Sequence, residues 1–476
     1  MPLRARITSP AFAAAQSFSS SQMQSDDIAT KELPGDEPRD VLFGAINGLR
    51  TITLNRPKKL NSLNGSMARK ILPRLLEWRK SQMVSVVLIK GEGRAFCAGG
   101  DVTALALANK EGKEGQQSSK NYFALEYKLD HVIATYSIPY VASMDGITMG
   151  GGVGLSVHAP FRIATENTVF AMPETTIGFF PDVGGSFFLP RLDGGLGLYL
   201  ALTSEQLKAA DVFWSGIATH YIHSSSLPDV EARLAELQFG DHTKKAERLR
   251  IINDTLEEFC TGLPQEQSPA HGVVGGDIRK TIDYIFQLDH DIDTILEGLQ
   301  SYVDAQEVPQ AIKDWAAKTK KTILQRSPTS VKVTIQQLRE GRRWNIAETF
   351  RKEHVIASHF MEHADFVEGV SALLINKPKT TPNWNPSSLD GVSSKDVASF
   401  FKPEPSLQLL DDGEMQVVRY NQYPHRWTGL PRDQDIWQVL KEGNQNKDKL
   451  VERFVKDYKG KQGVKEKVEE ACERLG

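Results

Sequence analysis

Short apolar runs alternate with amphipathic helical stretches along the chain as far as residue 195, and this alternation predicts an α/β fold. Residues 41–46 and 50–54 form a predicted hairpin, because Asn47-Gly48 between them is the strongest short hairpin signal. The other elements expected here are strands at 84–89, 139–144, 161–164 and 168–172, helices at 60–80, 101–108, 122–136 and 150–157, a glycine-rich loop at 91–100 and a flexible segment at 110–119. Strand, strand and helix recur, so the repeats are expected to stack as a spiral.

Beyond residue 195 the apolar positions recur at helical spacing, which predicts a helical region. The helices expected are 196–202, 229–237, 278–288, 292–299, 311–326, 331–339, 344–362 and 364–374, followed by a linker or wrapped arm at 376–405 and a helical stretch at 447–474. Between residues 441 and 467 there are nine Lys or Arg against five Asp or Glu. That mild basic bias is typical of a solvated helix face, with partner binding as the alternative.

These shifts in pattern divide the chain into four parts. Residues 39–275 form the predicted α/β core, 276–390 a C-terminal helical region, and 391–476 a linker with a C-terminal extension. Residues 1–28 contain Arg4, Arg6 and several serines, with no acid before Asp26. That composition is typical of a mitochondrial transit peptide, and a plain unstructured N-terminus is the alternative.

Composition narrows the classes of function. A formal net charge of −3 gives no argument for binding nucleic acid or an anionic membrane. The chain has no apolar run of about 18 residues, so no transmembrane helix is expected. Its three cysteines are widely spaced and form no C-x-x-C, which is evidence against a disulfide framework or a zinc site.

Two glycine-rich turns, each between a predicted strand and a helix, carry the first candidate chemistry. One is Ala98-Gly99-Gly100-Asp101, and the other runs through residues 149–155. Glycines let a ligand approach the backbone, and a helix N-terminus presents unbonded N–H groups. Two such turns can each supply one N–H to a single oxygen, as a thioester carbonyl needs when it becomes an oxyanion. Tight helix–sheet packing is the alternative for the glycines, and Asp101 is expected to cap its helix.

Two carboxylates follow the second turn. Glu174 comes after a proline in an apolar context, and Asp182 lies eight residues further on. Desolvation would raise the pKa of such a carboxyl and suit it to general acid–base work, although the spacing alone also fits two acids on surface loops. Cys97 is expected to be buried without reactivity, and the histidine pairs at 220/223 and 359/363 lack the H-E-x-x-H pattern of a metal site.

At these residues the chain resembles the crotonase (enoyl-CoA hydratase/isomerase) superfamily, and within it the 3-hydroxyisobutyryl-CoA hydrolase family. The segments that carry the resemblance are 94–101, 146–158, 172–175, 180–185, 188–192, 327–330 and 365–370. One departure separates the chain from the hydratases: where they carry their first catalytic glutamate, this chain has Gly154. The hydrolase family keeps a glutamate at the position of Glu174 and adds an aspartate at that of Asp182, and both are present here.

The resemblance implies a crotonase-like spiral of β-β-α repeats with a C-terminal helical region, and a coenzyme A thioester bound across the glycine turns. The amides of Gly100 and Gly151 would form the oxyanion hole. Glu174 would activate water or attack the thioester to form a mixed anhydride, and Asp182 would orient the substrate hydroxyl or assist proton transfer. Further substrate contacts are implied for Glu126 and Ala98, with Lys58 and Lys59 as candidates for the coenzyme A phosphates; no metal or redox cofactor is implied.

The implied activity is hydrolysis of 3-hydroxyisobutyryl-CoA to 3-hydroxyisobutyrate and coenzyme A, in valine catabolism in the mitochondrial matrix. A structural role is the alternative, because crotonase-like proteins occur in the mitochondrial small ribosomal subunit and the tail after about residue 400 keeps that role open. An enoyl-CoA hydratase or isomerase is disfavoured by Gly154. The expected partners are the thioester and, under the alternative, the mitoribosome; no membrane is expected, and the oligomeric state is left open.

Overall fold

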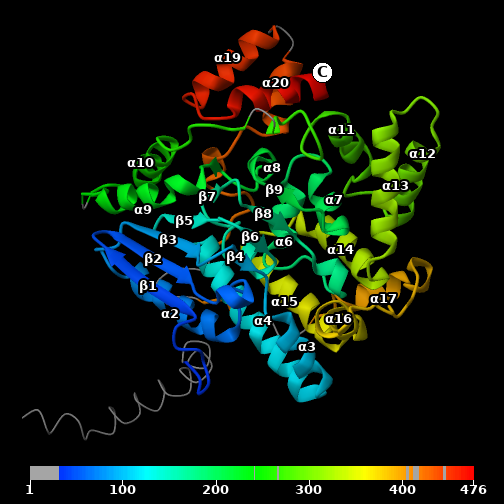
Figure 1. Cartoon of the computed structure of the whole chain (residues 1–476). Coiled ribbons are helices and arrows are strands. Elements are labelled where there is room, and N and C mark those ends of the chain that lie inside the picture. Colours follow the sequence, from blue (N-terminus) through cyan, green and yellow to red (C-terminus); the bar gives the residue numbers. More distant parts are fainter. Residues whose placement is uncertain (1–31, 241, 265–266, 404–406, 411–417, 443–445) are drawn as a thin grey trace, which may run out of the picture.

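The computed structural model describes residues 32–476 except 241, 265–266, 404–406, 411–417 and 443–445 (Figure 1). The transit peptide predicted at 1–28 lies outside the described residues. None of the described helices is long and apolar enough to cross a membrane.

Two β-sheets form the α/β part of the molecule. The six-stranded sheet has the order β1-β2-β3-β5-β7-β10, and the four-stranded sheet has the order β4-β6-β8-β9. The strands are β1 Val41–Ile46, β2 Leu49–Leu54, β3 Val86–Gly91, β4 Ala95–Ala98, β5 Tyr140–Ser143, β6 Ile147–Met149, β7 Phe161–Ala164, β8 Val169–Ala171, β9 Leu207–Lys208 and β10 His220–Tyr221. The predicted hairpin is present, with β1 and β2 antiparallel around Asn47 at a positive φ of 50°.

Successive turns of the chain place one strand in each sheet, which produces a spiral. Strands β3, β5 and β7 pair in parallel in the larger sheet, and the strands that follow them, β4, β6 and β8, pair in parallel in the smaller one. Helices complete the turns: α3 Val102–Lys110 and α4 Lys113–Ala134 after β4, α5 Gly151–Gly154 after β6, and the 3₁₀ helix η3 Glu174–Ile177 after β8. The predicted spiral of β-β-α repeats is therefore confirmed.

Two local predictions in this part are wrong. Residues 91–100 were expected to be a loop but contain β4, a strand of four residues that is too short for apolar alternation to reveal. Residues 110–119 were expected to be flexible but belong mostly to α4, which packs closely on α3. A Cβ on Gly115 would lie 1.7 Å from the Ala108 carbonyl oxygen, and the Ser119 hydroxyl donates to Asn109 over 2.7 Å. These contacts hold a sequence that carries little helical signal by itself.

The helices predicted beyond residue 195 are present, although the stretch predicted at 447–474 is broken between 457 and 464. Helices at 210–214, 245–257, 394–399 and 433–441 are additions. As far as residue 375 the bounds, with those of the remaining helices of the core, are α2 Gly65–Arg79, α6 Gly185–Phe188, α7 Leu196–Thr203, α8 Ala210–Trp214, α9 Leu227–Glu236, α10 Lys245–Glu257, α11 Gly276–Ile285, α12 Ile292–Asp304, α13 Gln310–Leu324, α14 Pro328–Gly341, α15 Ile346–Glu362, α16 Ala364–Val370 and a π-helix Ser371–Ile375. Two short 3₁₀ helices are η2 Pro57–Lys59 and η4 Leu189–Arg191.

The C-terminal segment is built into the same hydrophobic core. Its helices are α17 Ser394–Ser399, α18 Asp433–Lys441, α19 Lys447–Asp457 and α20 Val464–Leu475, and the last two pack together at the end of the molecule (Figure 1). Ile436, Leu450 and Val464 are fully buried in the main apolar cluster, which begins at Val41. Burial of this apolar surface attaches the segment to the core.

The prediction of a solvated face is wrong for one side of α20. Lys467, Glu470 and Arg474 on this helix are at least nine-tenths buried. Lys467 pairs with Asp433 over 2.7 Å, and Arg474 pairs with Asp433 over 2.7 Å and with Asp283 of α11 over 3.0 Å. Some basic residues of the tail therefore belong to this buried network, whereas others, such as Lys449 and Arg453 of α19 and Lys465 of α20, are exposed.

Candidate active site

The two glycine turns lie next to each other because β4 and β6 are parallel neighbours. Ala98 at the end of β4 is paired with Met149 at the end of β6, so both turns leave the sheet at the same edge. A Cβ on Gly151 would lie 3.4 Å from the Gly100 nitrogen. Among the described residues, no hydrogen bond of a turn, loop or side chain uses the Gly100 or Gly151 N–H. The structure thus brings together two unused amides, as an oxyanion hole requires.

The first turn is fixed by the segment that follows η2. The Ala98 N–H donates to the Leu60 carbonyl over 3.0 Å, and the Leu63 N–H donates to the Gly99 carbonyl over 2.8 Å. Gly99 has a φ of +106°, which a residue with a side chain rarely adopts. Lys58 and Lys59 are exposed and precede Leu60 directly, so they lie at the margin of this turn.

Four buried carboxyl groups gather beside the turns. Glu126 and Asp130 lie one helical turn apart on α4, Glu174 begins η3, and Asp182 lies in the loop before α6, and none is more than 5% exposed. A Cβ on Gly151 would lie 2.6 Å from Glu126 Oε1, and one on Gly150 would lie 3.1 Å from Glu174 Oε1. The carboxyls predicted at Glu126 and Glu174 therefore flank the second turn, and the interpretation of Glu174 and Asp182 as acids of surface loops is wrong.

These carboxyls lack the partners that buried charges normally have. Glu126 Oε1, Glu174 Oε2 and both oxygens of Asp130 accept no hydrogen bond from any described residue. Burial raises the pKa of Glu174 well above its usual value, and the nearby Asp182 adds to the shift. Burial likewise raises the pKa of Glu126 and of Asp130. A raised pKa favours the protonated carboxyl, which can donate a proton, and perturbed groups of this kind are typical of acid–base sites.

Asp182 is held by a tyrosine that the sequence did not single out. The Tyr127 hydroxyl donates to Asp182 Oδ2 over 2.7 Å. Burial raises the pKa of Asp182 to about 7, although the hydrogen bond from Tyr127 favours the charged form. Tyr127 follows Glu126 directly on α4, so one helix supplies both a carboxyl of the site and the donor that orients another.

The loop that carries Asp182 is fastened from the helical region. Glu353 of α15 accepts the N–H groups of Gly184 over 2.7 Å and Ser186 over 2.8 Å. Burial raises the pKa of Glu353 to about 8 despite these two bonds. The Gln337 amide of α14 donates to the Pro181 carbonyl over 2.6 Å. Residues far along the chain thus set the position of Asp182.

The C-terminal segment reaches the same loop through a histidine. His158 Nε2 lies 2.9 Å from the Val183 carbonyl, and His158 Nδ1 lies 2.7 Å from the Tyr423 hydroxyl. Burial lowers the pKa of His158 to about 4, so the ring is neutral at physiological pH. Because a carbonyl only accepts, Nε2 carries the proton and Nδ1 accepts from Tyr423. Val183, at a positive φ of 51°, follows Asp182 directly.

Gly154 leaves no room for a second glutamate. A Cβ at this position would lie 2.6 Å and 2.8 Å from the two carboxyl oxygens of Asp130. The space that the first glutamate of a hydratase needs is therefore taken by the Asp130 side chain, which the sequence did not indicate as part of the site. The spacing of Glu126 and Asp130, four residues apart on a predicted helix, was the signal available for it.

Other candidate residues have structural partners. Asp101 occupies the position before α3 but makes no side-chain cap, because its carboxylate instead pairs with Arg56 over 3.3 Å; the predicted cap is wrong. Cys97 is fully buried, as expected, and burial raises the pKa of its thiol to about 12. His220 is buried against Glu257. Within the described part of the chain, no group of His, Cys, Asp and Glu side chains is arranged to hold a metal ion.

The spiral fold and this arrangement of glycine amides facing buried carboxyls define a crotonase-type protein. The family model described as "Enoyl-CoA hydratase/isomerase" matches residues 49–401. The chain belongs to the enoyl-CoA hydratase/isomerase family.

Relatives of two kinds are similar to the chain. Small ribosomal subunit protein mS47 of Neurospora crassa is 51% identical over 482 residues, which cover 100% of this chain and 92% of that protein. The mitochondrial 3-hydroxyisobutyryl-CoA hydrolase of Gallus gallus is 43% identical over 375 residues, covering 77% of this chain and 90% of the hydrolase. Among solved structures, a carnitinyl-CoA dehydratase from Mycobacterium thermoresistibile superposes with a TM-score of 0.67 at 32% identity, covering 78% of this chain and 98% of its own.

Proposed function

We propose that the protein hydrolyses the thioester bond of 3-hydroxyisobutyryl-CoA. The observation that carries the proposal is the position of the Gly100 and Gly151 amides, both unused, beside the buried carboxyls of Glu174 and Asp182. The hydrolase of Gallus gallus, at 43% identity, supports this substrate. The Asp130 carboxyl opposite Gly154 argues against a hydratase that works with two glutamates. The mitochondrial names of the relatives support action in the mitochondrial matrix.

In the proposed reaction the thioester carbonyl oxygen accepts hydrogen bonds from Gly100 and Gly151. Each such donor contributes about 10²–10³ to the rate as negative charge develops on that oxygen. Glu174 either adds to the carbonyl carbon, forming a mixed anhydride that water then cleaves, or takes a proton from the water that attacks. By either route one water is consumed, the C–S bond breaks, and the sulfur leaves as a thiolate that is protonated to coenzyme A.

Asp182 fits the recognition of the 3-hydroxyl group. Tyr127 donates to Oδ2, which leaves Oδ1 to accept the hydroxyl proton of the substrate. Lys58 and Lys59, exposed beside the first turn, are suited to bind the coenzyme A phosphates as point charges. No step of this reaction needs a metal or a redox cofactor.

Thiol release from 3-hydroxyisobutyryl-CoA tests the proposal. The protein lacking residues 1–28 should turn over this substrate, and Glu174→Gln should lower kcat by at least about 10²-fold. Glu77→Gln, an exposed glutamate on α2, serves as the matched control and should keep full activity. Absence of turnover in the wild type, or an active Glu174→Gln variant, would refute the proposal. Incorporation of ¹⁸O from water into the Glu174 carboxyl would indicate the anhydride route.

A second role, in the small subunit of the mitochondrial ribosome, is favoured by how much of this chain each relative matches. The alignment with mS47 of Neurospora crassa spans the whole chain, whereas the alignment with the Gallus gallus hydrolase covers 77% of it. The exposed face of α19 carries Lys449, Arg453 and Lys456, which suit contact with an anionic partner.

Co-sedimentation with mitoribosomes tests this role. Reversing the charges of Lys449, Arg453 and Lys456 should release the protein at lower salt than the wild type, with thermal stability unchanged. Deletion of residues 401–476 would be a poor test, because Ile436, Leu450 and Val464 belong to the core. Free migration of the wild type at every salt concentration would argue against the ribosomal role and leave the hydrolase proposal untouched.

A further inference from the structure

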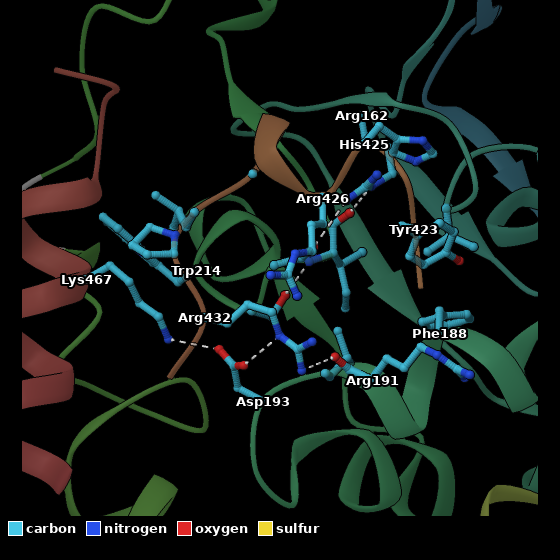
Figure 2. A pocket seen from close by; sticks show the side chains of 18 of the residues that line it. Arg162, Phe188, Arg191, Asp193, Trp214, Tyr423, His425, Arg426, Arg432 and Lys467 are labelled. Atoms are coloured by element: carbon cyan, nitrogen blue, oxygen red, sulfur yellow. Dashed lines mark hydrogen bonds and ion pairs between the residues drawn. The ribbon is translucent and has the colours of Figure 1, made fainter. Parts of the chain in front are cut away.

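A cavity of about 110 Å³ lies where the C-terminal segment meets the α/β core, and its walls are strongly basic (Figure 2). Its charged and ionisable lining residues are Arg162, Arg191 and Asp193 from the core and His425, Arg426, Arg432 and Lys467 from the C-terminal segment, with Tyr423 beside them. None of the four carboxyls beside the glycine turns lines this cavity.

The single carboxylate among these lining residues is already shared. Asp193 accepts Arg432 Nε over 3.4 Å and Lys467 Nζ over 3.5 Å, and Figure 2 shows it between these two side chains. Its charge is therefore not available to the cations on the remaining walls. Arg426 is half-exposed at the rim, and its nearest carboxylate, Asp435, is 3.9 Å away.

Two arginines of the cavity have no counter-charge. Neither Arg162 nor Arg191 forms an ion pair with any carboxylate in the described part of the chain. Their guanidinium groups donate only to backbone carbonyls: Arg162 to Ala159, Gly216 and Ile217, and Arg191 to Phe187, Gly341, Arg342, Trp344 and Asn421. Carbonyl dipoles hold a guanidinium in place but leave its charge uncompensated. A cation removed from water without a counter-charge costs free energy, and an anion in the cavity would lower that cost.

Supporting evidence comes from the ionisation of these groups. Burial lowers the pKa of Arg162 to about 10, and that of Arg191 also to about 10. His425 is 7% exposed, and its Nε2 atom has no hydrogen-bond partner among the described residues. An imidazole nitrogen left without a partner is costly, and as an N–H it can donate to an oxyanion.

The volume of the cavity limits the size of the anion. Pockets that enclose a drug-sized ligand measure about 300–1,000 Å³, so a cavity of about 110 Å³ suits a smaller ion. We propose that this cavity binds a small tetrahedral oxyanion, either inorganic phosphate or the phosphate group of a small phosphomonoester, on Arg162, Arg426 and His425, while Arg191, whose five N–H groups all donate to carbonyls, contributes only its charge. Tetrahedral oxyanions match guanidinium groups because several oxygens can each accept a charge-assisted hydrogen bond.

Calorimetric titration of the whole chain with sodium phosphate tests the proposal, with sodium chloride at matched ionic strength as the reference. In the titration phosphate should bind saturably, and in a separate thermal unfolding experiment it should raise Tm. Chloride should do neither. Arg426→Gln, a rim variant expected to fold normally, should raise the Kd for phosphate about three- to fivefold. His425→Asn should raise it as well. Glycerol 3-phosphate distinguishes the two sources, because a cavity that encloses the whole ion should accept inorganic phosphate alone.

Two control variants separate this cavity from other phosphate sites. Arg233→Gln, an exposed arginine on α9 outside the cavity, should leave the Kd unchanged. Lys58→Gln should also bind phosphate as the wild type does, although it lies where the coenzyme A phosphates are proposed to bind. Equal effects of phosphate and chloride would overturn the proposal, and so would a Kd that changes in Lys58→Gln but not in Arg426→Gln. No substrate is present, so failure here leaves the hydrolase proposal intact.

Discussion

Two buried groups of charged side chains in this molecule have opposite character. Around the glycine turns, Glu126, Asp130, Glu174 and Asp182 lie together with no cation among their hydrogen-bond partners in the described residues, and burial raises their pKa values. Between the core and the C-terminal segment, four carboxylates are interleaved with four cations: Asp193, Asp283, Asp433 and Glu470 with Arg279, Arg432, Lys467 and Arg474. Burial by itself would raise the pKa of Asp433, but Lys467, Arg279 and Arg474 lower it well below its usual range.

The difference separates a group of charges that holds the fold from one suited to chemistry. A carboxylate in a network that holds as many cations as carboxylates is charged in the folded protein and joins two segments of the chain. If one partner is removed, the remaining charges stay buried without a counter-charge, which destabilises the fold. Buried carboxyls without cationic partners do not join segments of the chain, and their burial lowers the stability of the folded protein. Groups that are costly to bury and free to exchange protons mark sites of function rather than of stability.

The largest expected effect is a loss of stability when the network of four carboxylates and four cations is broken. Asp433→Asn should lower the free energy of unfolding by about 3–5 kcal/mol, because Lys467 and Arg474 both lose their shortest carboxylate contact. Urea unfolding measures the change. Asp435→Asn on the same helix, whose carboxylate is 3.9 Å from Arg426, is the control and should change stability by less than about 0.5 kcal/mol. Equal stability of Asp433→Asn and wild type would mean that the network does not attach the segment.

A substitution that places a methyl group against Asp130 tests the carboxyls beside the glycine turns. Gly154→Ala should destabilise the fold by about 1–3 kcal/mol, because the new Cβ would lie 2.6 Å from a carboxyl oxygen of Asp130. The double variant with Asp130→Ala should recover most of that loss, since the clash is with the deleted carboxyl. Gly262→Ala, where a Cβ would meet nothing within 4 Å, is the control. Thermal unfolding of the four proteins gives the coupling energy, and additive effects would show that Asp130 does not fill the position of a hydratase glutamate.

Sequence reasoning located the parts of the site that lie close together along the chain. The glycine turns, Glu174 and Asp182 are read from local patterns, and the spiral follows from the recurrence of strands and helices. Tyr127 and Glu353 could not be found in this way, because their roles come from tertiary contacts with a loop 55 and 167–169 residues away. The error on α20 has the same cause: amphipathic charge patterns look alike whether the charged face meets water or a complementary set of buried charges.

The two groups should also respond to pH with opposite sign. For a carboxyl with a raised pKa the folded state binds the proton more tightly, so its contribution to stability is present below the unfolded pKa of about 4 and is lost as pH rises through the folded value. For Asp433, with a lowered pKa, the contribution is present above about pH 4 and is lost as pH falls. The stability of Asp130→Asn relative to wild type should therefore grow as pH rises above about 4, by at most about 1.4 kcal/mol per pH unit.

The pH dependence of stability should differ for Asp433, which belongs to the network of four carboxylates and four cations. Asp433→Asn should remain destabilised by a constant amount over pH 5–8 and approach the wild type only in acid. Urea midpoints measured across the pH range, with no substrate present, give both curves. Parallel curves for Asp130→Asn and wild type would mean that the unpaired carboxyls titrate as exposed groups do.

The smallest effect concerns a hydrogen-bonded contact between the C-terminal segment and the loop that carries Asp182. Tyr423→Phe removes the donor to His158 Nδ1, and His158 in turn donates to the carbonyl of Val183, next to Asp182. The loss of one buried hydrogen bond should cost about 1 kcal/mol of stability, and looser placement of Asp182 should lower kcat by roughly two- to tenfold with KM little changed. Tyr420→Phe is matched to it, because Tyr420 lies in the same segment but donates to the Ala134 carbonyl instead. If both variants lose stability and only Tyr423→Phe has a lower kcat, Tyr423 is a positioning residue. If kcat is equal in the two variants, the contact of Tyr423 with His158 only stabilises the fold, as the network of four carboxylates and four cations does.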